Sequence, residues 1–314
     1  MKNTNNIIAL IFLYSLDRLE QLDYLCSTVT GFDIYLTVSD QHKNNEKLLL
    51  FYKKYKDRII NLDFHPNYGV DIAPFITQLI SIDSNRYPYF IKLHSKASKL
   101  GVYDHVDWGS ILWDSLIGNQ HLFDYNIKIL QQTNVGAITQ PLLIFNNKEL
   151  NNIQKIKILC NLFDIDYDSV KNSYFMAGSM FMSKTHVFQN IIHKHAKYLH
   201  TILSTEYGKV DDRDHTNGTF CHAMERLFGY IIINKDLIIH KSSLYPIINI
   251  YNSKEKILHL HITYNNIAYL VQDFNICGHI ENNNSKNFTI TWYNLKNLKA
   301  SYQYLDRRIA TRQV

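Results

Sequence analysis

A run of basic and hydroxyl side chains follows an apolar segment at residues 89–93. The run reads His94-Ser95-Lys96-Ala97-Ser98-Lys99. Lysine ammonium groups supply point charges for a phosphate, and serine hydroxyls can donate hydrogen bonds to its oxygens. The run therefore predicts an anion site around Lys96 and Lys99. Loop lysines are also often simply solvated, and that alternative stays open at this point.

A second segment, residues 65–71, reads His65-Pro66-Asn67-Tyr68-Gly69-Val70-Asp71 and precedes an apolar helical pattern. Pro66 and Gly69 fit a tight turn, and Asp71 stands where the N-cap of a helix belongs. Taken alone, the segment predicts a turn and a capped helix as readily as a ligand site.

The third segment, residues 174–182, places Ala177-Gly178-Ser179 inside a bulky apolar run. Small residues in such a run indicate that another group approaches the backbone closely, but a bulged core strand explains them equally well. In the fourth segment His222, Glu225 and Arg226 share a helix face at i, i+3 and i+4, away from Met224. A glutamate in this position is ordinarily an exposed surface residue.

These segments lie within an alternation of apolar runs and helical patterns. Apolar runs that read as strands covered on both faces lie at 7–14, 32–38, 59–64, 89–93 and 135–139. Helices are predicted at 17–27, 43–56, 71–80, 109–132, 185–200 and 219–233. The alternation predicts an α/β fold with a parallel sheet, in which ligands bind at the carboxyl ends of the strands.

Composition narrows the class of protein. Of 314 residues, 46% are hydrophobic, which suffices for a large core, and the four cysteines are too scattered for a disulfide scaffold or a zinc site. The net charge of +5 is modest for a nucleic-acid binder, so we expect no nucleic-acid partner. P-loop, G-x-G-x-x-G, G-x-S-x-G and H-E-x-x-H motifs are absent from the sequence. No apolar stretch is long enough to span a membrane, and we expect a soluble, cytoplasmic protein.

The four segments together resemble the rhamnan-synthesis protein F (RgpF-type) glycosyltransferases over about residues 5–235. Val70 departs from the family pattern, in which Arg is usual at this position. The resemblance implies a GT-A-like, Rossmann-like fold: a mostly parallel sheet flanked by helices, with a small C-terminal extension. The expected division is a nucleotide-sugar transferase domain at 1–235 and an extension or accessory subdomain at 236–314.

The resemblance also implies roles for individual residues. Asn67, Gly69 and Asp71 would line the nucleotide pocket of the donor, with Asp71 on the base or ribose, and His94 and Ser95 would also bind the donor. Gly178 and Ser179 would lie under the sugar and the acceptor. Glu225 would be the general base, with Asp212 and then Asp214 as reserve candidates. Trp108 could stack on a sugar ring. The implied reaction moves a sugar, by the family name rhamnose, from a nucleoside diphosphate to a glycan by inverting single displacement.

The metal requirement is a separate expectation. GT-A enzymes typically hold a divalent cation with Asp-x-Asp after the fourth strand, where this chain has His94-Ser95-Lys96. Lysine offers no oxygen ligand, so we expect no metal, with Lys96 and Lys99 neutralising the diphosphate directly. Binding of Mn²⁺ or Mg²⁺ through His94 and a distant carboxylate stays open. So do peripheral association with a membrane and a non-catalytic nucleotide-sugar or glycan-binding module.

Overall fold

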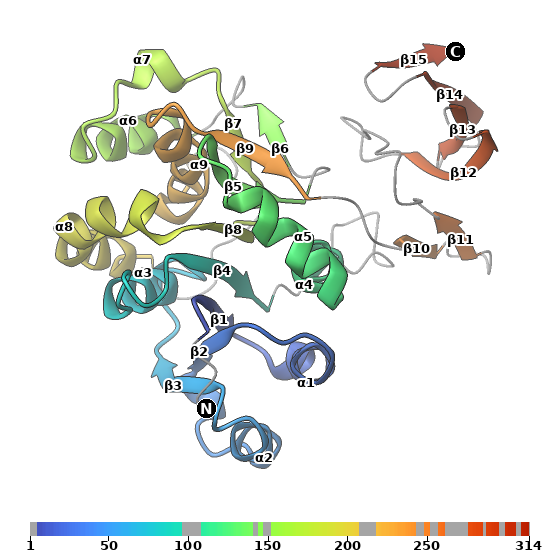
Figure 1. Cartoon of the computed structure of the whole chain (residues 1–314). Coiled ribbons are helices and arrows are strands. Elements are labelled where there is room, and N and C mark those ends of the chain that lie inside the picture. The colour runs from blue at the N-terminus through green and yellow to red at the C-terminus, as the bar shows by residue number, and fades with distance from the viewer. Residues whose placement is uncertain are drawn as a thin grey trace.

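The computed structural model describes most of the chain up to residue 242 and several strands beyond it. The described residues are 5–95, 108–140, 144–146, 152–206, 218–242, 248–251, 257–260, 276–284, 287–294, 299–305 and 309–313. Helices cover both faces of a seven-stranded sheet. On the left of Figure 1 lie α3 (Ile72–Ser81) and α8 (Thr185–Ser204), and on the right lie α1 (Leu19–Thr28), α4 (Trp108–Ile117) and α5 (Gln120–Leu130).

The sheet has the strand order β3-β2-β1-β4-β8-β5-β9. Its strands are β1 (Ile7–Leu13), β2 (Asp33–Ser39), β3 (Ile59–His65), β4 (Tyr89–His94), β5 (Val135–Thr139), β8 (Phe181–Lys184) and β9 (Ile238–Lys241). The pairs β1–β2, β2–β3, β1–β4 and β5–β9 are parallel, whereas β8 runs antiparallel to β4 and β5. The α/β class with an open, mostly parallel, Rossmann-like sheet is confirmed.

Two hydrophobic cores form because successive side chains of a strand point to opposite faces of the sheet. Ile8 and Leu10 of β1 pack in one cluster, with residues of α3, α6, α8 and α9. Ala9 and Ile11 pack in the other, with residues of α1, α2, α4 and α5. The helices are α1 (Leu19–Thr28), α2 (Glu46–Lys54), α3 (Ile72–Ser81), α4 (Trp108–Ile117), α5 (Gln120–Leu130), α6 (Ile153–Leu162), α7 (Tyr167–Val170), α8 (Thr185–Ser204) and α9 (Phe220–Ile233), with short 3-10 turns η1 (Leu16–Arg18) and η2 (Asp40–His42).

One predicted helix is wrong, and so is the bulged core strand, one of the two explanations offered for residues 174–182. The single helix expected at 109–132 is two helices, because Asn119 caps α5 by accepting a hydrogen bond from the amide of Leu122 at 2.9 Å. The run at 174–182 is not one strand: β7 (Tyr174–Met176) pairs with β6 (Ile144–Asn146), and β8 enters the main sheet. The small residues between β7 and β8 therefore form a turn rather than a bulge.

Beyond β9 the described segments are strands. β10 (Ile248–Tyr251) pairs with β11 (Ile257–Leu260), and β12 (Ile276–Asn284), β13 (Asn287–Asn294), β14 (Lys299–Leu305) and β15 (Ile309–Gln313) form an antiparallel meander. β9 pairs with β5, so the main sheet extends to Lys241. The division of the chain at 235 stays a prediction.

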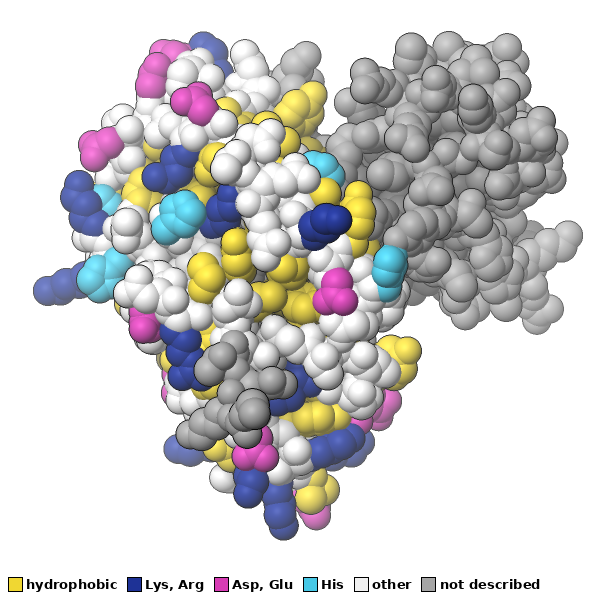
Figure 2. Space-filling model, in the orientation of Figure 1, with side chains coloured by type: hydrophobic (Ala, Val, Ile, Leu, Met, Phe, Trp, Pro, Cys, Tyr) yellow, Lys and Arg dark blue, Asp and Glu magenta, His cyan; other side chains and the backbone are white. Residues whose placement is uncertain are grey.

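The described surface carries mixed charge. On the face in Figure 2 the Lys and Arg side chains are scattered among Asp, Glu and neutral residues rather than gathered in one field. Within the described residues, no helix is both long enough and apolar enough to cross a bilayer.

Candidate functional site

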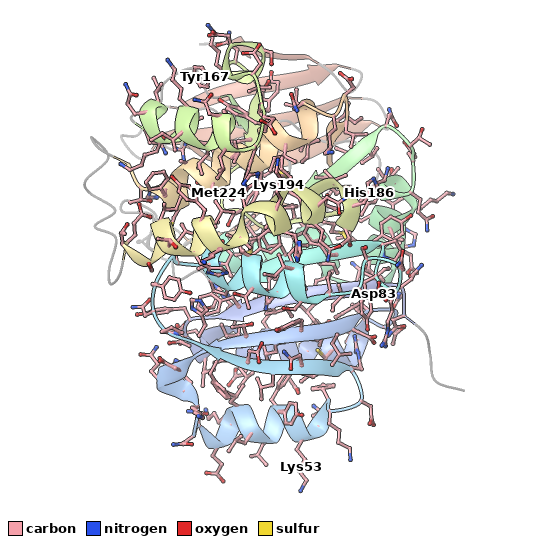
Figure 3. The ribbon with its side chains drawn as sticks, turned by 90° about the vertical axis from the view of Figure 1, so that its left-hand side faces the viewer. Lys53, Asp83, Tyr167, His186, Lys194 and Met224 are labelled. Carbon is pink, nitrogen blue, oxygen red and sulfur yellow. The ribbon has the colours of Figure 1, made fainter. Side chains whose placement is uncertain are left out.

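The strand order changes direction at the carboxyl edge between β1 and β4. From β1 the chain proceeds outward to β2 and β3 on one side and returns to β4 on the other, which is the switch point where open α/β sheets bind ligands. In Figure 3, Asp83 and His186 mark the opposite edge on the right, so the carboxyl edge lies on the left.

Ser95 joins the carboxyl ends of β1 and β4 at this switch point. Its amide donates to the carbonyl of Phe12 at 2.9 Å, and its hydroxyl oxygen accepts from the amides of Tyr14 at 2.7 Å and Ser15 at 3.1 Å. These bonds tie the strand ends together. The hydroxyl proton of Ser95 is not used by them, so the expected hydrogen bond to a donor phosphate remains a prediction.

The loop after β3 directs Asp71 into the sheet edge. Gly69 and Val70 adopt positive φ angles of 65° and 51°, and a Cβ at Gly69 would lie 2.6 Å from the Cβ of Ala73. Asp71 precedes α3, but its side chain makes no capping bond to the helix. The N-cap interpretation is therefore wrong at the level of the side chain, because the carboxylate has other partners.

Those partners are Lys92 and Ser179. Lys92 is only 1% exposed, and its ammonium donates to Oδ2 of Asp71 and, at 3.1 Å, to Oγ of Ser179. Ser179 donates to the same Oδ2 at 2.5 Å. Burial by itself would raise the pKa of Asp71, but the nearby His94 and Lys92 and the hydrogen bonds from Lys92 and Ser179 hold that pKa well below its ordinary value.

The Gly178–Ser179 turn is held from two further directions. Both residues have positive φ, 81° and 51°. The amide of Gly178 donates to Oε1 of Glu225 at 2.5 Å, and its carbonyl accepts from Nε2 of His94 at 2.9 Å. The turn thus joins α9, β4 and the loop before α3 at one point.

Helix α9 presents Glu225 because its start and its middle are both fixed. Thr219 caps it through the amide of His222 at 3.1 Å, and Glu206 accepts from the amide of Phe220 at 2.5 Å. Gly229 lies one turn after Glu225, where an added Cβ would come within 2.2 Å of the carbonyl oxygen of Tyr174. The absence of a side chain lets α9 lie directly against β7.

Arg226 borders the carboxylate of Glu225. Its Nη1 lies 3.4 Å from Oε2 of Glu225 and donates to the carbonyl of His222 at 2.8 Å. The guanidinium also lies over the ring of Phe175, 4.9 Å from its centroid. The Glu225 and Arg226 side chains are 17% and 19% exposed, so the pair sits at a partly open surface rather than in the core.

The structure thus brings together residues from four separate sequence segments: Asp71, His94, Gly178, Ser179 and Glu225. Ser95 lies at the adjacent switch point between β1 and β4, and Asn67 and Gly69 lie in the loop that leads to Asp71. Lys96, Lys99, Asp212 and Asp214 lie outside the described residues, as does the side chain of Trp108.

Sequence reasoning missed Lys92. The signal was present, since Lys92 interrupts the apolar run 89–93. A lysine in a strand covered on both faces needs a buried anionic partner. That requirement points to an aspartate at the same edge of the sheet.

The described residues do not fit a divalent metal. The oxygen of Asp71 that faces His94, at 3.6 Å, already accepts from an ammonium group and a hydroxyl. Hard cations prefer several free oxygen ligands. Among the described residues no three His, Cys, Asp or Glu side chains are grouped to hold a metal ion.

Fold and site define an α/β protein with a Rossmann-like sheet whose polar residues converge at the carboxyl edge. The family model described as rhamnan synthesis protein F matches residues 1–237, and the chain belongs to this family. No curated protein matches the chain.

Proposed function

We propose that the protein is a glycosyltransferase with a GT-A-like site, which moves a sugar from a nucleoside diphosphate to a glycan acceptor. The observation that supports this proposal best is the contact between motif segments. Glu225, the proposed base, touches the Gly178 turn, and the same turn touches His94 and, through Ser179, Asp71. Membership of the rhamnan synthesis protein F family agrees with a role in polysaccharide assembly.

In the proposed arrangement the donor diphosphate binds at the switch point between β1 and β4, beside Ser95. Lys96 and Lys99 follow directly in the sequence and would neutralise the leaving diphosphate. The proposed role of Asp71 differs from the donor-binding role that the family resemblance implies. Because its carboxylate is bonded to Lys92 and Ser179, it holds the turn beneath the sugar.

The chemistry assigned to the site is a single displacement. Glu225 accepts the proton of the acceptor hydroxyl, and the acceptor oxygen forms a bond to the anomeric carbon. The bond from that carbon to the diphosphate oxygen breaks, and the nucleoside diphosphate leaves with the electron pair. A carboxylate performs this role when it lies within hydrogen-bonding reach of the hydroxyl.

The replacement Glu225→Gln tests the base directly. The glutamine amide oxygen can still accept from the amide of Gly178, so the turn keeps its support while the proton acceptor is lost. We expect release of nucleoside diphosphate to fall about 100-fold or more, with donor affinity unchanged. Glu206→Gln is the matched control, because it keeps an acceptor for the start of α9 away from the proposed base.

A non-catalytic nucleotide-sugar or glycan-binding module is the alternative, and one observation favours it. Oε1 of Glu225 is already bonded to a backbone amide, which is also how a purely structural glutamate behaves. If Glu225→Gln binds nucleotide sugar like the wild type and neither protein turns it over with any glycan acceptor, the module is the better description.

The donor site has its own test. We expect a nucleoside diphosphate to raise the melting temperature in the presence of EDTA, because a ligand that binds only the folded state stabilises it by mass action. A shift that requires Mn²⁺ would keep the transferase and contradict the metal-independent proposal. If no nucleotide gives a shift under either condition, the donor site is wrong.

A further inference from the structure

His65 ends β3 with no hydrogen-bond partner for either ring nitrogen. The residue is 7% exposed, and neither Nδ1 nor Nε2 makes a hydrogen bond of normal geometry among the described residues, although the backbone of Pro66 lies near the ring. Buried polar side-chain atoms in folded proteins nearly always have a partner, and leaving one unpaired costs free energy of folding. Two such atoms on one side chain therefore need an explanation.

The position of the His65 ring is set by aromatic neighbours. The ring of Tyr68 lies 4.6 Å from it, centroid to centroid, and the ring of Phe12 meets it edge-on at 6.1 Å. The Tyr68 hydroxyl in turn contacts Nδ1 of His200 at 3.3 Å, and Nε2 of His200 contacts the hydroxyl of Thr77 at the same distance. His200 thus has partners for both ring nitrogens, whereas those of His65 make no hydrogen bond of normal geometry among the described residues.

His65 lies on the same sheet edge as the proposed diphosphate site. It is paired with Ser39 at the end of β2, and β2 is the neighbour of β1. The spacing of adjacent strands puts β3 about 14 Å from β4 across this edge. That distance is comparable to the length of an extended nucleoside diphosphate. A donor with its diphosphate between β1 and β4 can therefore carry its nucleoside toward β3.

The ring chemistry favours the nucleoside over the phosphate. Burial lowers the pKa of His65 below its ordinary value, so the imidazole is neutral near pH 7. A neutral imidazole offers one N–H donor and one acceptor nitrogen. That combination suits the amide-like edge of a base or a ribose hydroxyl, whereas a phosphate anion is bound better by a protonated ring.

We propose that His65 binds the nucleoside part of the donor, through the base or the ribose, with Tyr68 as the aromatic surface beside it. This inference rests on the proposed function. It assigns nucleoside recognition to the end of β3 rather than to Asp71, whose carboxylate is bonded within the protein.

The test compares His65→Phe with the wild type by calorimetric titration. The probes are uridine, thymidine, guanosine and adenosine diphosphates and inorganic pyrophosphate. Phenylalanine keeps the ring and removes both nitrogens. We expect the affinity for the preferred nucleoside diphosphate to fall about tenfold, with pyrophosphate binding unchanged. A loss shared by all four bases would assign the contact to the ribose, and a loss confined to one base would assign it to that base.

Stability gives an independent control. Because His65→Phe removes two unpartnered polar atoms, the free protein should melt at the same temperature as the wild type or higher. His186→Phe is the matched replacement at the opposite edge of the sheet (Figure 3), and its affinities should equal those of the wild type. If His65→Phe does not fold, ring-nitrogen NMR of the wild type serves instead: the nucleoside diphosphate should shift the His65 signals and pyrophosphate should not.

Two outcomes overturn the inference, and they are distinguishable. If the wild type binds a nucleoside diphosphate and His65→Phe binds it equally well, His65 is not a ligand and the proposed function stands. If the wild type binds none of the four, the donor site falls and the assignment of His65 falls with it.

Discussion

Val70 carries backbone strain at the entrance to the site. It adopts φ of 51° although it is β-branched, and its side chain is 45% exposed, so little packing offsets the strain. Asparagine tolerates this conformation far better. We expect Val70→Asn to increase the free energy of unfolding by about 1 kcal/mol, measured by urea denaturation. Val70→Ile should give no gain, and an Asn variant no more stable than the Ile variant would contradict the strain argument.

The ion pair between Lys92 and Asp71 leads to a second prediction about individual residues. Lys92→Met leaves the Asp71 carboxylate, 12% exposed, without its ammonium partner, and we expect a loss of about 3 kcal/mol in unfolding free energy. In the double variant, Asp71→Asn also removes the carboxylate charge that Lys92→Met leaves without a partner. The double variant should therefore lose less than the sum of the single losses, by 1 kcal/mol or more in a denaturation cycle. Additive losses would mean that the two side chains are not coupled.

Sequence reasoning reached some of these residues and not others. Position alone identified Asp71, because Gly69 two residues earlier indicated a turn into a helix. Its actual partners could not be predicted, since Ser179 is 108 residues away along the chain. Contacts between strands depend on register, and no local pattern in a single sequence encodes which residues face each other across a sheet.

At the scale of the element, Gly229 fixes the distance between α9 and β7. A methyl group there would lie 2.2 Å from the backbone oxygen of Tyr174, which cannot move like a flexible side chain. We expect Gly229→Ala to lower the free energy of unfolding by about 1–3 kcal/mol and to displace Glu225 from the Gly178 turn. Thermal melting and turnover should therefore both fall.

Gly109→Ala is the control for this prediction. Gly109 lies within α4, and the three atoms nearest to its added methyl, at 2.6–2.9 Å, all belong to the guanidinium of Arg18, the far end of a flexible side chain. Alanine favours a helix over glycine, so the control should be neutral or slightly stabilising. Equal losses for Gly109→Ala and Gly229→Ala would show that close packing on β7 is not the cause.

The pattern of apolar residues predicted whether an element is a helix or a strand more reliably than it predicted the direction of a strand in the sheet. The first five strands were predicted within one or two residues at each end, because long apolar runs are the strongest local signal. The reversal of β8 was not predicted. Its four residues, Phe181–Lys184, are buried in either orientation, so their pattern carries no information on direction.

At the scale of the molecule, the buried ionisable groups predict how stability depends on pH. Burial lowers the pKa of His65 and of His200, so both bind a proton more readily when unfolded. The contribution of these two histidines to the free energy of unfolding is complete above about pH 6.5, and it is lost as the pH falls toward their folded-state pKa values. Asp71 acts at lower pH, because its folded-state pKa lies below the unfolded value of about 3.9. Its contribution is present above that pH and is lost as the pH falls through the folded-state pKa.

The unfolding free energy should therefore decline in two stages on acidification. The two stages can be distinguished by measuring the denaturation midpoints of the wild type and of two variants between pH 8 and pH 3. His65→Phe should have a shallower slope than the wild type as the pH falls below about 6.5, and the same slope once the pH is below the folded-state pKa of His65. Asp71→Asn should have the same slope as the wild type just below pH 6.5 and a shallower slope below pH 4. Burial is also the chief cause that lowers the pKa values of His200, His186 and His195. These three histidines therefore keep part of the first stage in the His65 variant. Identical slopes for His65→Phe and the wild type just below about pH 6.5 would mean that His65 is not buried as the structure describes.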